Sequence, residues 1–167
     1  MKNKINNYVW SQLGASLDML ENAINLCPEK VWNQNKSFSD FWYITYHTLF
    51  WLDFNMTESP EDFIAPKNIG ETELDPKGIL PEKVFSKEEL KSYLKHCRIK
   101  CKTTIENLNE ESINKDYKFG TIELTFFELL LYSMRHVQHH TGQLNLILRQ
   151  KIDSAPRWVK TANDKLS

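Results

Sequence analysis

Hydrophobic residues recur with helical spacing in four stretches of the chain, roughly residues 5–27, 40–56, 87–109 and 126–150. Side chains three and four positions apart lie on one face of a helix, so such spacing is typical of an amphipathic helix. In the first stretch the apolar face consists of Leu13, Leu17, Leu20 and Ile24. In the third it consists of Leu90, Leu94, Cys97, Cys101, Ile105 and Leu108. The pattern therefore predicts four helices of substantial length.

Polar residues predict where three of these helices begin. Ser86 is followed three positions later by Glu89, and Thr125 is followed in the same way by Glu128. Both pairs have the form of a capping box, in which the hydroxyl and the carboxylate each bond a free backbone N–H. The segment Ser37–Asp40 predicts a similar pair at the start of the second helix.

The lengths of the connecting segments predict how the helices are arranged. Residues 28–39 and 110–124 are short links, which favour antiparallel neighbours, and the second is expected to contain an extended or hairpin segment around Gly120. Residues 57–85 form a much longer link with four prolines. It can travel the length of a bundle, since extended chain covers ~3.3 Å per residue. We expect an all-α fold: an up-down-down-up four-helix bundle with a long crossover between helices two and three. An up-down-up-down bundle with a decorated loop is the alternative.

The composition is that of one soluble domain spanning residues 1–167. Hydrophobic residues make up 41% and charged residues 26%, and the net charge of −1 follows from 21 basic and 22 acidic residues. This balance predicts neither a nucleic-acid partner nor an anionic membrane surface, and no apolar run approaches ~20 residues. The N-terminus lacks the apolar core of a signal peptide, and three cysteines are too few for a disulfide scaffold. We expect a cytoplasmic protein whose Cys97 and Cys101 are core residues.

Histidines carry the main chemical signal. His136 and His140 are one helical turn apart, so both imidazoles project from one face and are spaced to bind one metal ion at ~2.0–2.1 Å. His139 lies off that face and is the weaker ligand candidate. His47, in the aromatic-rich second helix, is the candidate for a third ligand, because ligands in helical bundles converge in the core. The alternative for each is an ordinary hydrogen-bonded histidine.

These segments resemble the DinB-like (DinB/YfiT-like) superfamily of metal-binding four-helix bundles. The resemblance rests on His47–Asp53 in the second helix, on His136–Gln143 in the fourth, and on the tail Ala155–Val159 with its Pro and Trp. It covers essentially the whole chain. One departure is Thr141, where many members have Arg, and we expect it to alter either the residues behind the metal ligands or the rim of the site without abolishing metal binding.

The resemblance implies a divalent metal, zinc or nickel, held by His47, His136 and His140. It also implies a small-molecule substrate, since the superfamily includes thiol S-transferases that use low-molecular-weight thiols such as bacillithiol and mycothiol, as well as isomerases and hydrolases. We expect a metal-dependent thiol S-transferase or hydrolase. Two alternatives stay open: a metal-binding or homodimeric module of the same fold without catalysis, and a helical interaction protein whose histidines are structural.

Helical spacing also suggests which residues surround such a site. Tyr43 and Trp51 lie one turn on either side of His47, and Tyr132 lies one turn before His136. The two tyrosines are more consistent with core packing than with ligand binding, and Trp51 with packing than with stacking on a substrate. Gln143 is a candidate to support the metal ligands, and Gly142 is expected to permit a close approach between helices. No catalytic residue can be assigned from the sequence.

Overall fold

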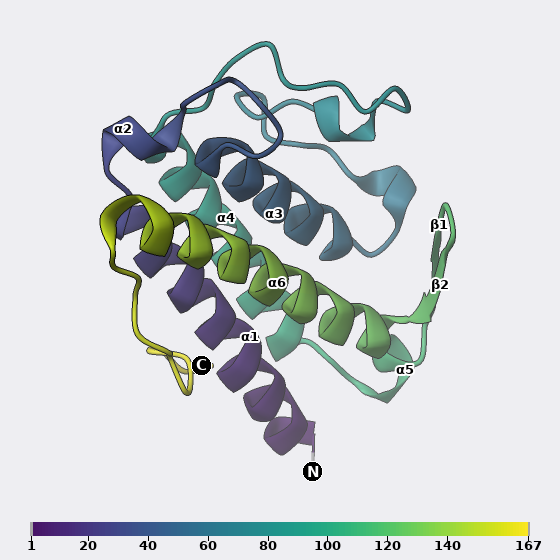
Figure 1. The fold of residues 1–167 in the computed structure, drawn as a ribbon. Coiled ribbons are helices and arrows are strands. Elements are labelled where there is room, and N and C mark those ends of the chain that lie inside the picture. The colour runs from purple at the N-terminus through teal and green to yellow at the C-terminus, as the bar shows by residue number, and fades with distance from the viewer. Residues whose placement is uncertain (1, 167) are drawn as a thin grey trace.

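The computed structural model describes residues 2–166 (Figure 1), and most of them are helical. The long helices are α1 (Lys2–Leu26), α3 (Phe41–Asn55), α4 (Lys87–Glu106) and α6 (Phe126–Ile152). Shorter elements are α2 (Glu29–Trp32), α5 (Glu110–Ile113), the 3₁₀ turns Pro60–Asp62 and Thr72–Leu74, and the strands β1 (Asp116–Phe119) and β2 (Ile122–Thr125). The expected helical class is confirmed. The sequence pattern missed α2 and α5, because a single turn is too short to show a period.

The two capping boxes form as the sequence predicts. The hydroxyl of Ser86 accepts the backbone N–H of Glu89 at 3.2 Å, and the carboxylate of Glu89 accepts the backbone N–H of Ser86 at 2.9 Å. In the same way, the hydroxyl of Thr125 accepts the backbone N–H of Glu128 at 3.3 Å, and the carboxylate of Glu128 accepts the backbone N–H of Thr125 at 2.8 Å. These bonds satisfy backbone donors that the first turn of a helix leaves free. They fix the first residues of α4 and α6.

The start of α3 differs from the prediction. Asp40 occupies the capping position, but its side chain makes no capping bond. Its carboxylate instead accepts the backbone N–H groups of Asn35 and Ser37, both at 3.1 Å. The expected Ser37–Asp40 capping pair is therefore wrong, because the carboxylate closes the preceding loop rather than the helix.

A β-hairpin connects α5 to α6, as the extended segment around Gly120 predicts. Its strands are antiparallel and Phe119 pairs with Ile122. Gly120 has φ +57°, a left-handed conformation that glycine adopts without steric cost. The hairpin projects beside the start of α6 in Figure 1. It thereby holds residues of its turn next to the face of α6.

Each long helix packs against two others. Helix α1 contacts α4 and α6, and α3 contacts the same two. In Figure 1, α1 and α6 run in one direction and α3 and α4 in the other. The largest fully buried side chains are mainly aromatic: Trp10, Phe41, Trp42, Tyr46, Phe50 and Phe54. Within residues 2–166, no helix is long and apolar enough to cross a membrane.

Helix α3 is buried on nearly every side. Its mean composition is strongly apolar, which is typical of a helix enclosed by other elements. The outer side is covered by the crossover, residues 57–85, which passes over α3 in Figure 1. The crossover contributes buried Phe63, Ala65, Ile69 and Phe85 to the same core. The long link is therefore part of the packed structure.

A buried ionic network joins α3 to α4. Asp53 is 1% exposed. Its carboxylate accepts hydrogen bonds from the ammonium of Lys100 at 2.7 Å, from the hydroxyl of Tyr93 at 2.9 Å and from Nε2 of His96 at 3.3 Å. A buried carboxylate is tolerated only when such partners compensate it. His96 therefore has a structural partner and lies apart from the other histidines of the sequence pattern.

The C-terminal tail folds back along α1. The backbone N–H of Ala162 donates to the carbonyl of Ser11 at 2.9 Å, and Nε1 of Trp10 donates to the carbonyl of Asp164 at 3.1 Å. A Cβ atom at Gly14 would lie 2.7 Å from Cβ of Ala162. The glycine thus lets the tail approach the helix closely.

All three cysteines are free and buried, and Cys97 and Cys101 are 0% exposed on the inner face of α4. Burial raises the pKa of the Cys101 thiol to about 12 and that of Cys27 to about 12. Because the thiolate is the reactive form, we expect a bulky thiol reagent to label the native protein at least ~100-fold more slowly than the denatured protein. Mass spectrometry of labelled chains checks this, with the denatured protein as control. Rapid labelling of Cys97 or Cys101 in the native state would contradict core burial.

Candidate metal centre

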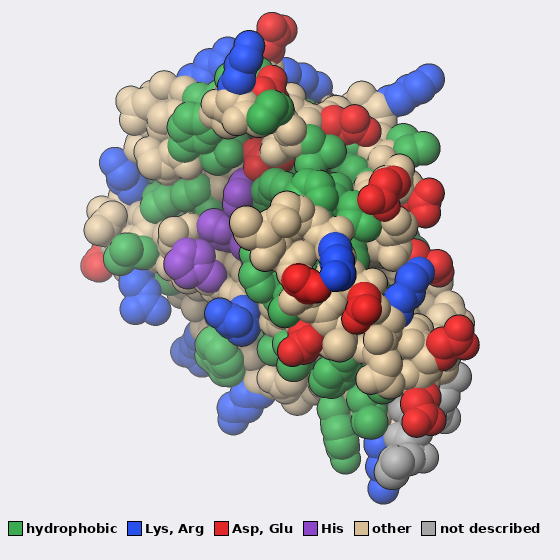
Figure 2. Space-filling model, turned by 90° about the vertical axis from the view of Figure 1, so that its right-hand side faces the viewer, with side chains coloured by type: hydrophobic (Ala, Val, Ile, Leu, Met, Phe, Trp, Pro, Cys, Tyr) green, Lys and Arg blue, Asp and Glu red, His purple; other side chains and the backbone are tan. Residues whose placement is uncertain are grey.

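Three histidines from two helices meet on the surface between α3 and α6. Nε2 of His136 lies 3.3 Å from Nε2 of His47 and 3.0 Å from Nε2 of His140. The ligand atoms of the three side chains all lie within 4.8 Å of one another. Figure 2 shows histidine side chains gathered together on one face of the molecule. The structure therefore brings together the three residues that the sequence and the resemblance singled out.

The opposite ring nitrogens of two of these histidines are anchored. Nδ1 of His47 donates to the carboxylate of Glu73 at 2.7 Å. Nδ1 of His140 donates to Oε1 of Gln143, also at 2.7 Å. With Nδ1 protonated, a neutral imidazole carries its lone pair on Nε2. The anchoring bonds therefore direct both lone pairs toward His136.

The spacing of the Nε2 atoms fits one bound cation. A neutral His136 with its proton on Nε2 can donate to only one of the two lone pairs that face it, whereas a cation between the rings can bind all three nitrogens. Two imidazoles bound at ~2.0–2.1 Å to a tetrahedral zinc ion have nitrogens about 3.3 Å apart. The observed 3.0 and 3.3 Å agree with that separation. The residues present thus fit a divalent metal.

The electrostatic environment keeps the rings of His136 and His140 neutral. Burial, followed by the neighbouring His140 and His47, lowers the pKa of His136 to about 3. Burial also lowers the pKa of His140. A histidine must be unprotonated to bind a metal. At neutral pH His136 and His140 are therefore in the form that binds a metal.

Glu73 is the site residue that sequence reasoning missed. It lies on the 3₁₀ turn Thr72–Leu74 of the crossover, and its side chain is 5% exposed. Besides His47 it accepts Nε1 of Trp51 at 3.0 Å and a hydrogen bond from Tyr43. Burial alone would raise the pKa of Glu73, but these bonds outweigh it and the pKa is lowered. A buried carboxylate that holds a ligating histidine is a common feature of protein metal sites.

The other candidates around the histidines have distinct positions. Tyr43 bonds Glu73 rather than facing the centre, and the ring of Tyr132 lies nearly parallel to that of His136, at 11°. His139 is exposed, and its Nε2 lies 3.3 Å from Nε2 of Gln143. Gln143 thus contacts His139 and His140 together.

Two positions that follow the paired histidines do not line the site. Thr141 is 0% exposed and lies in the core, which excludes it from the rim, and an effect behind the metal ligands stays a prediction. Gly142 was expected to permit close helix packing, but a Cβ atom there would have nothing within 4 Å. Both follow from the helical period, because these positions are turned away from the shared face of His136 and His140.

Two pockets adjoin the histidines, and His136 and Tyr132 line both of them. The first, which we call the hairpin pocket, has a volume of about 410 Å³. It is lined by His47, Trp51, Phe119, Gly120, Thr121, Ile122, Tyr132 and His136. The second, the Arg135 pocket, has a volume of about 450 Å³ and is lined by Tyr132, Arg135, His136, Gln138 and His139. The centre is therefore accessible to small molecules.

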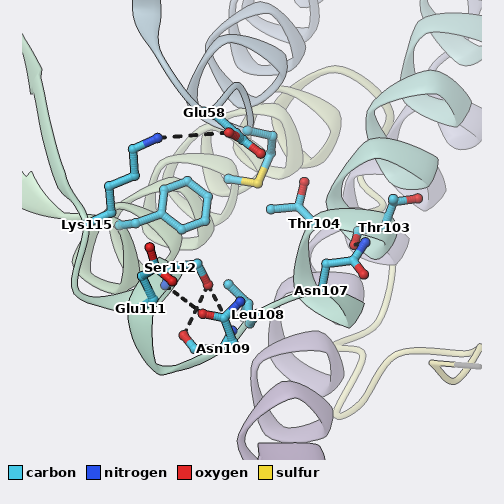
Figure 3. A pocket seen from close by; sticks show the side chains of 11 residues that line it. Glu58, Thr103, Thr104, Asn107, Leu108, Asn109, Glu111, Ser112 and Lys115 are labelled. Atoms are coloured by element: carbon cyan, nitrogen blue, oxygen red, sulfur yellow. Dashed lines mark hydrogen bonds and ion pairs between the residues drawn. The ribbon is translucent and has the colours of Figure 1, made fainter.

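A separate cavity of about 580 Å³ lies where the ends of α3 and α4 meet α5 (Figure 3). Glu58 and Lys115 form an ion pair of 3.9 Å there, and Asn109 and Ser112 bond each other in the cap of α5. Its lining contains neither histidine nor cysteine. Because these polar groups satisfy one another, the cavity does not compete with the histidine centre as the candidate functional site.

The donor set has a clear chemical character. Three neutral imidazoles leave the charge of a divalent cation uncompensated and at least one coordination position open. Structural zinc sites are closed by four protein ligands, whereas catalytic sites keep a position for water or substrate. Within residues 2–166, His47, His136 and His140 are the group that meets the geometric requirement for a metal site.

Comparison with known proteins identifies the family of this chain. The model of the DinB family matches residues 54–151. This segment contains Glu73, His136 and His140 and begins after His47. No curated protein and no solved structure matches the chain. The match spans more than half of the sequence and includes two of the three histidines, and the chain therefore belongs to the DinB family.

Proposed function

We propose that this protein binds zinc or nickel through His47, His136 and His140 and transfers a thiol to a small electrophile. The observation that carries the proposal is the convergence of three Nε2 atoms, two of the contacts being 3.0 and 3.3 Å. A divalent cation held there would lower the pKa of a thiol or water in its open position and leave a nucleophile at neutral pH.

The lining of the pockets favours a thiol over water as the nucleophile. Metal-dependent hydrolases commonly use a nearby carboxylate as general base. Neither the hairpin pocket nor the Arg135 pocket is lined by Asp or Glu. Glu73 is already bonded by His47 and Trp51. A thiol needs no such base, because coordination alone deprotonates it.

The proposed thiol transfer needs no oxidant, reductant or other reagent beyond the thiol and the electrophile. The thiol releases its proton to solvent, and the sulfur lone pair forms a bond to an electrophilic carbon. The bond between that carbon and its leaving group breaks, and its electron pair departs with the leaving group. In this scheme Glu73 and Gln143 hold the rings of His47 and His140. Trp51 and Tyr132 shield the reacting groups from water.

We infer that the long helices form the up-down-down-up bundle expected from the sequence. The supporting observations are the contacts of α1 and α3 with both α4 and α6 and the shared direction of α3 and α4 (Figure 1). The crossover between α3 and α4 is what allows these two helices to run the same way. It also brings Glu73 to His47.

The ligand assignment predicts distinct effects for three alanine variants. His136→Ala and His140→Ala should lower zinc affinity by more than the roughly 10–100-fold that loss of an outer partner of a metal ligand costs. His139→Ala is the matched control and should retain the metal, because its ring lies off the shared face. Competition with a chelator gives the affinities, and circular dichroism confirms folding. Full occupancy in His136→Ala would show that the wrong ligands are assigned.

The Glu73 contact predicts an effect at a residue that touches no metal. Glu73→Gln removes the negative charge behind His47 and should weaken zinc binding about tenfold. Glu71→Gln, an exposed neighbour two positions away, is the control and should have no effect. Isothermal titration of the metal-free variants measures both. Equal affinity in the two variants would mean that Glu73 serves only to hold the crossover.

The proposed reaction predicts metal-dependent turnover of a model pair. Zinc- or nickel-loaded protein should conjugate cysteine to chlorodinitrobenzene with release of chloride, and the metal-free protein and His136→Ala should show only the background rate. Absorbance of the conjugate measures the rate. Hydrolysis of para-nitrophenyl acetate by the same samples, without thiol transfer, would instead support the hydrolase alternative. Inactivity in both assays would support a non-catalytic metal-binding module.

A further inference from the structure

The two pockets that adjoin the histidines differ in chemical character. The hairpin pocket has no charged residue in its lining, and Trp51, Phe119 and Ile122 give it an apolar wall. Phe119 is held in place by the rings of Phe54 and Trp51, at centroid distances of 4.7 and 6.1 Å. This pocket suits an uncharged aromatic or branched aliphatic group.

The Arg135 pocket has the opposite character. Arg135 is exposed and lines the pocket together with His139 and Gln138, which can both donate hydrogen bonds. Among the described residues, no carboxylate pairs with Arg135, in contrast to Arg98, which pairs with Asp164 at 3.2 Å. A guanidinium without a protein partner is well suited to bind a carboxylate or phosphate in a bidentate manner.

The surroundings add to this positive character. No acidic side chain lines either pocket, and Glu73 is buried beneath His47. In Figure 2, Lys and Arg side chains border the histidines, while most of the visible Asp and Glu lie over the other half of that face. A bound divalent metal would add to the same field. An anionic reactant is therefore favoured on the Arg135 side.

His136 and Tyr132 are the two residues that line both pockets. Their rings lie nearly parallel, at 11°, with centroids 6.5 Å apart. The other lining residues come from α3 and the hairpin in one pocket and from α6 in the other. Two small molecules, one in each pocket, would both contact His136. A bond-forming reaction needs such proximity of its two reactants.

Resting on the proposed function, we infer that the two reactants bind in separate pockets. The Arg135 pocket takes a thiol that carries a carboxylate or phosphate group, and its sulfur reaches the histidine centre. The hairpin pocket takes the uncharged apolar electrophile. The anionic group thereby determines which reactant supplies the sulfur.

Equilibrium binding to zinc-loaded protein tests this division with two non-reacting probes. Mercaptosuccinate represents the anionic thiol, with uncharged thioglycerol as its comparison, and calorimetry measures both. The apolar probe is para-fluorobenzyl alcohol, followed by its fluorine NMR signal. Each probe should bind with nearly the same affinity in the presence of the other, because the pockets are separate.

Two variants should separate the pockets. Arg135→Gln should weaken mercaptosuccinate binding about tenfold, the effect of one charge-assisted contact, and leave thioglycerol and the apolar probe unchanged. Ile122→Thr should weaken the apolar probe at least about threefold and leave mercaptosuccinate unchanged. Arg149→Gln, on the exposed last turn of α6, and Ile64→Thr, at an exposed position of the crossover, are the matched controls.

Competition between the two probes would overturn the inference, since it would place both in one volume. Equal effects of Arg135→Gln and Arg149→Gln would overturn the anionic subsite. These measurements do not depend on turnover. If both probes bind as expected but no conjugate forms in the assay above, the proposed reaction is wrong and the division of the pockets stands. If conjugate forms while the probes compete, the reaction stands and the division is wrong.

Discussion

The convergence of three imidazole nitrogens is the constraint on which the histidine centre depends. Nε2 of His136 faces two further nitrogens at 3.0 and 3.3 Å, and burial and the neighbouring histidines lower its pKa to about 3, so its ring carries a single proton at neutral pH. On Nε2 that proton can bond only one of the two facing lone pairs. A divalent cation satisfies all three nitrogens at once. The packing of α3 against α6 and the bonds behind the rings hold the donors in place before metal binds. That preorganisation is what a metal site needs in order to be selective and tight.

The crossover connects the fold to the site. It covers the outer side of α3 with buried Phe63, Ile69 and Phe85, and the same segment delivers Glu73 to His47. The apolar contacts stabilise the position of the turn Thr72–Leu74, and Glu73 on this turn holds the ring of His47. Conversely, the buried carboxylate of Glu73 is tolerated because Tyr43, His47 and Trp51 all donate to it.

Much of this arrangement could be predicted from the sequence, because it depends on residues that lie close together in the chain. Helical spacing located the long helices, the capping boxes at Ser86 and Thr125 fixed two of their starts, and the i, i+4 spacing placed His136 beside His140. Glu73 could not be found in this way. It meets His47 across 26 positions, from a segment without any period, and nothing distinguishes it locally from Glu71. The predicted capping role of Asp40 is wrong for a related reason, since a carboxylate can close a loop as readily as a helix.

X-ray absorption at the metal edge of the zinc- or nickel-loaded protein tests the central claim most directly. The account predicts a first shell containing three imidazole nitrogens at about 2.0–2.1 Å, with the multiple-scattering pattern of the rings. Addition of a thiol should bring one sulfur into that shell, at about 2.3 Å for zinc, while the three imidazoles remain. A shell with fewer than three imidazoles, or one that a thiol does not enter, would contradict the account.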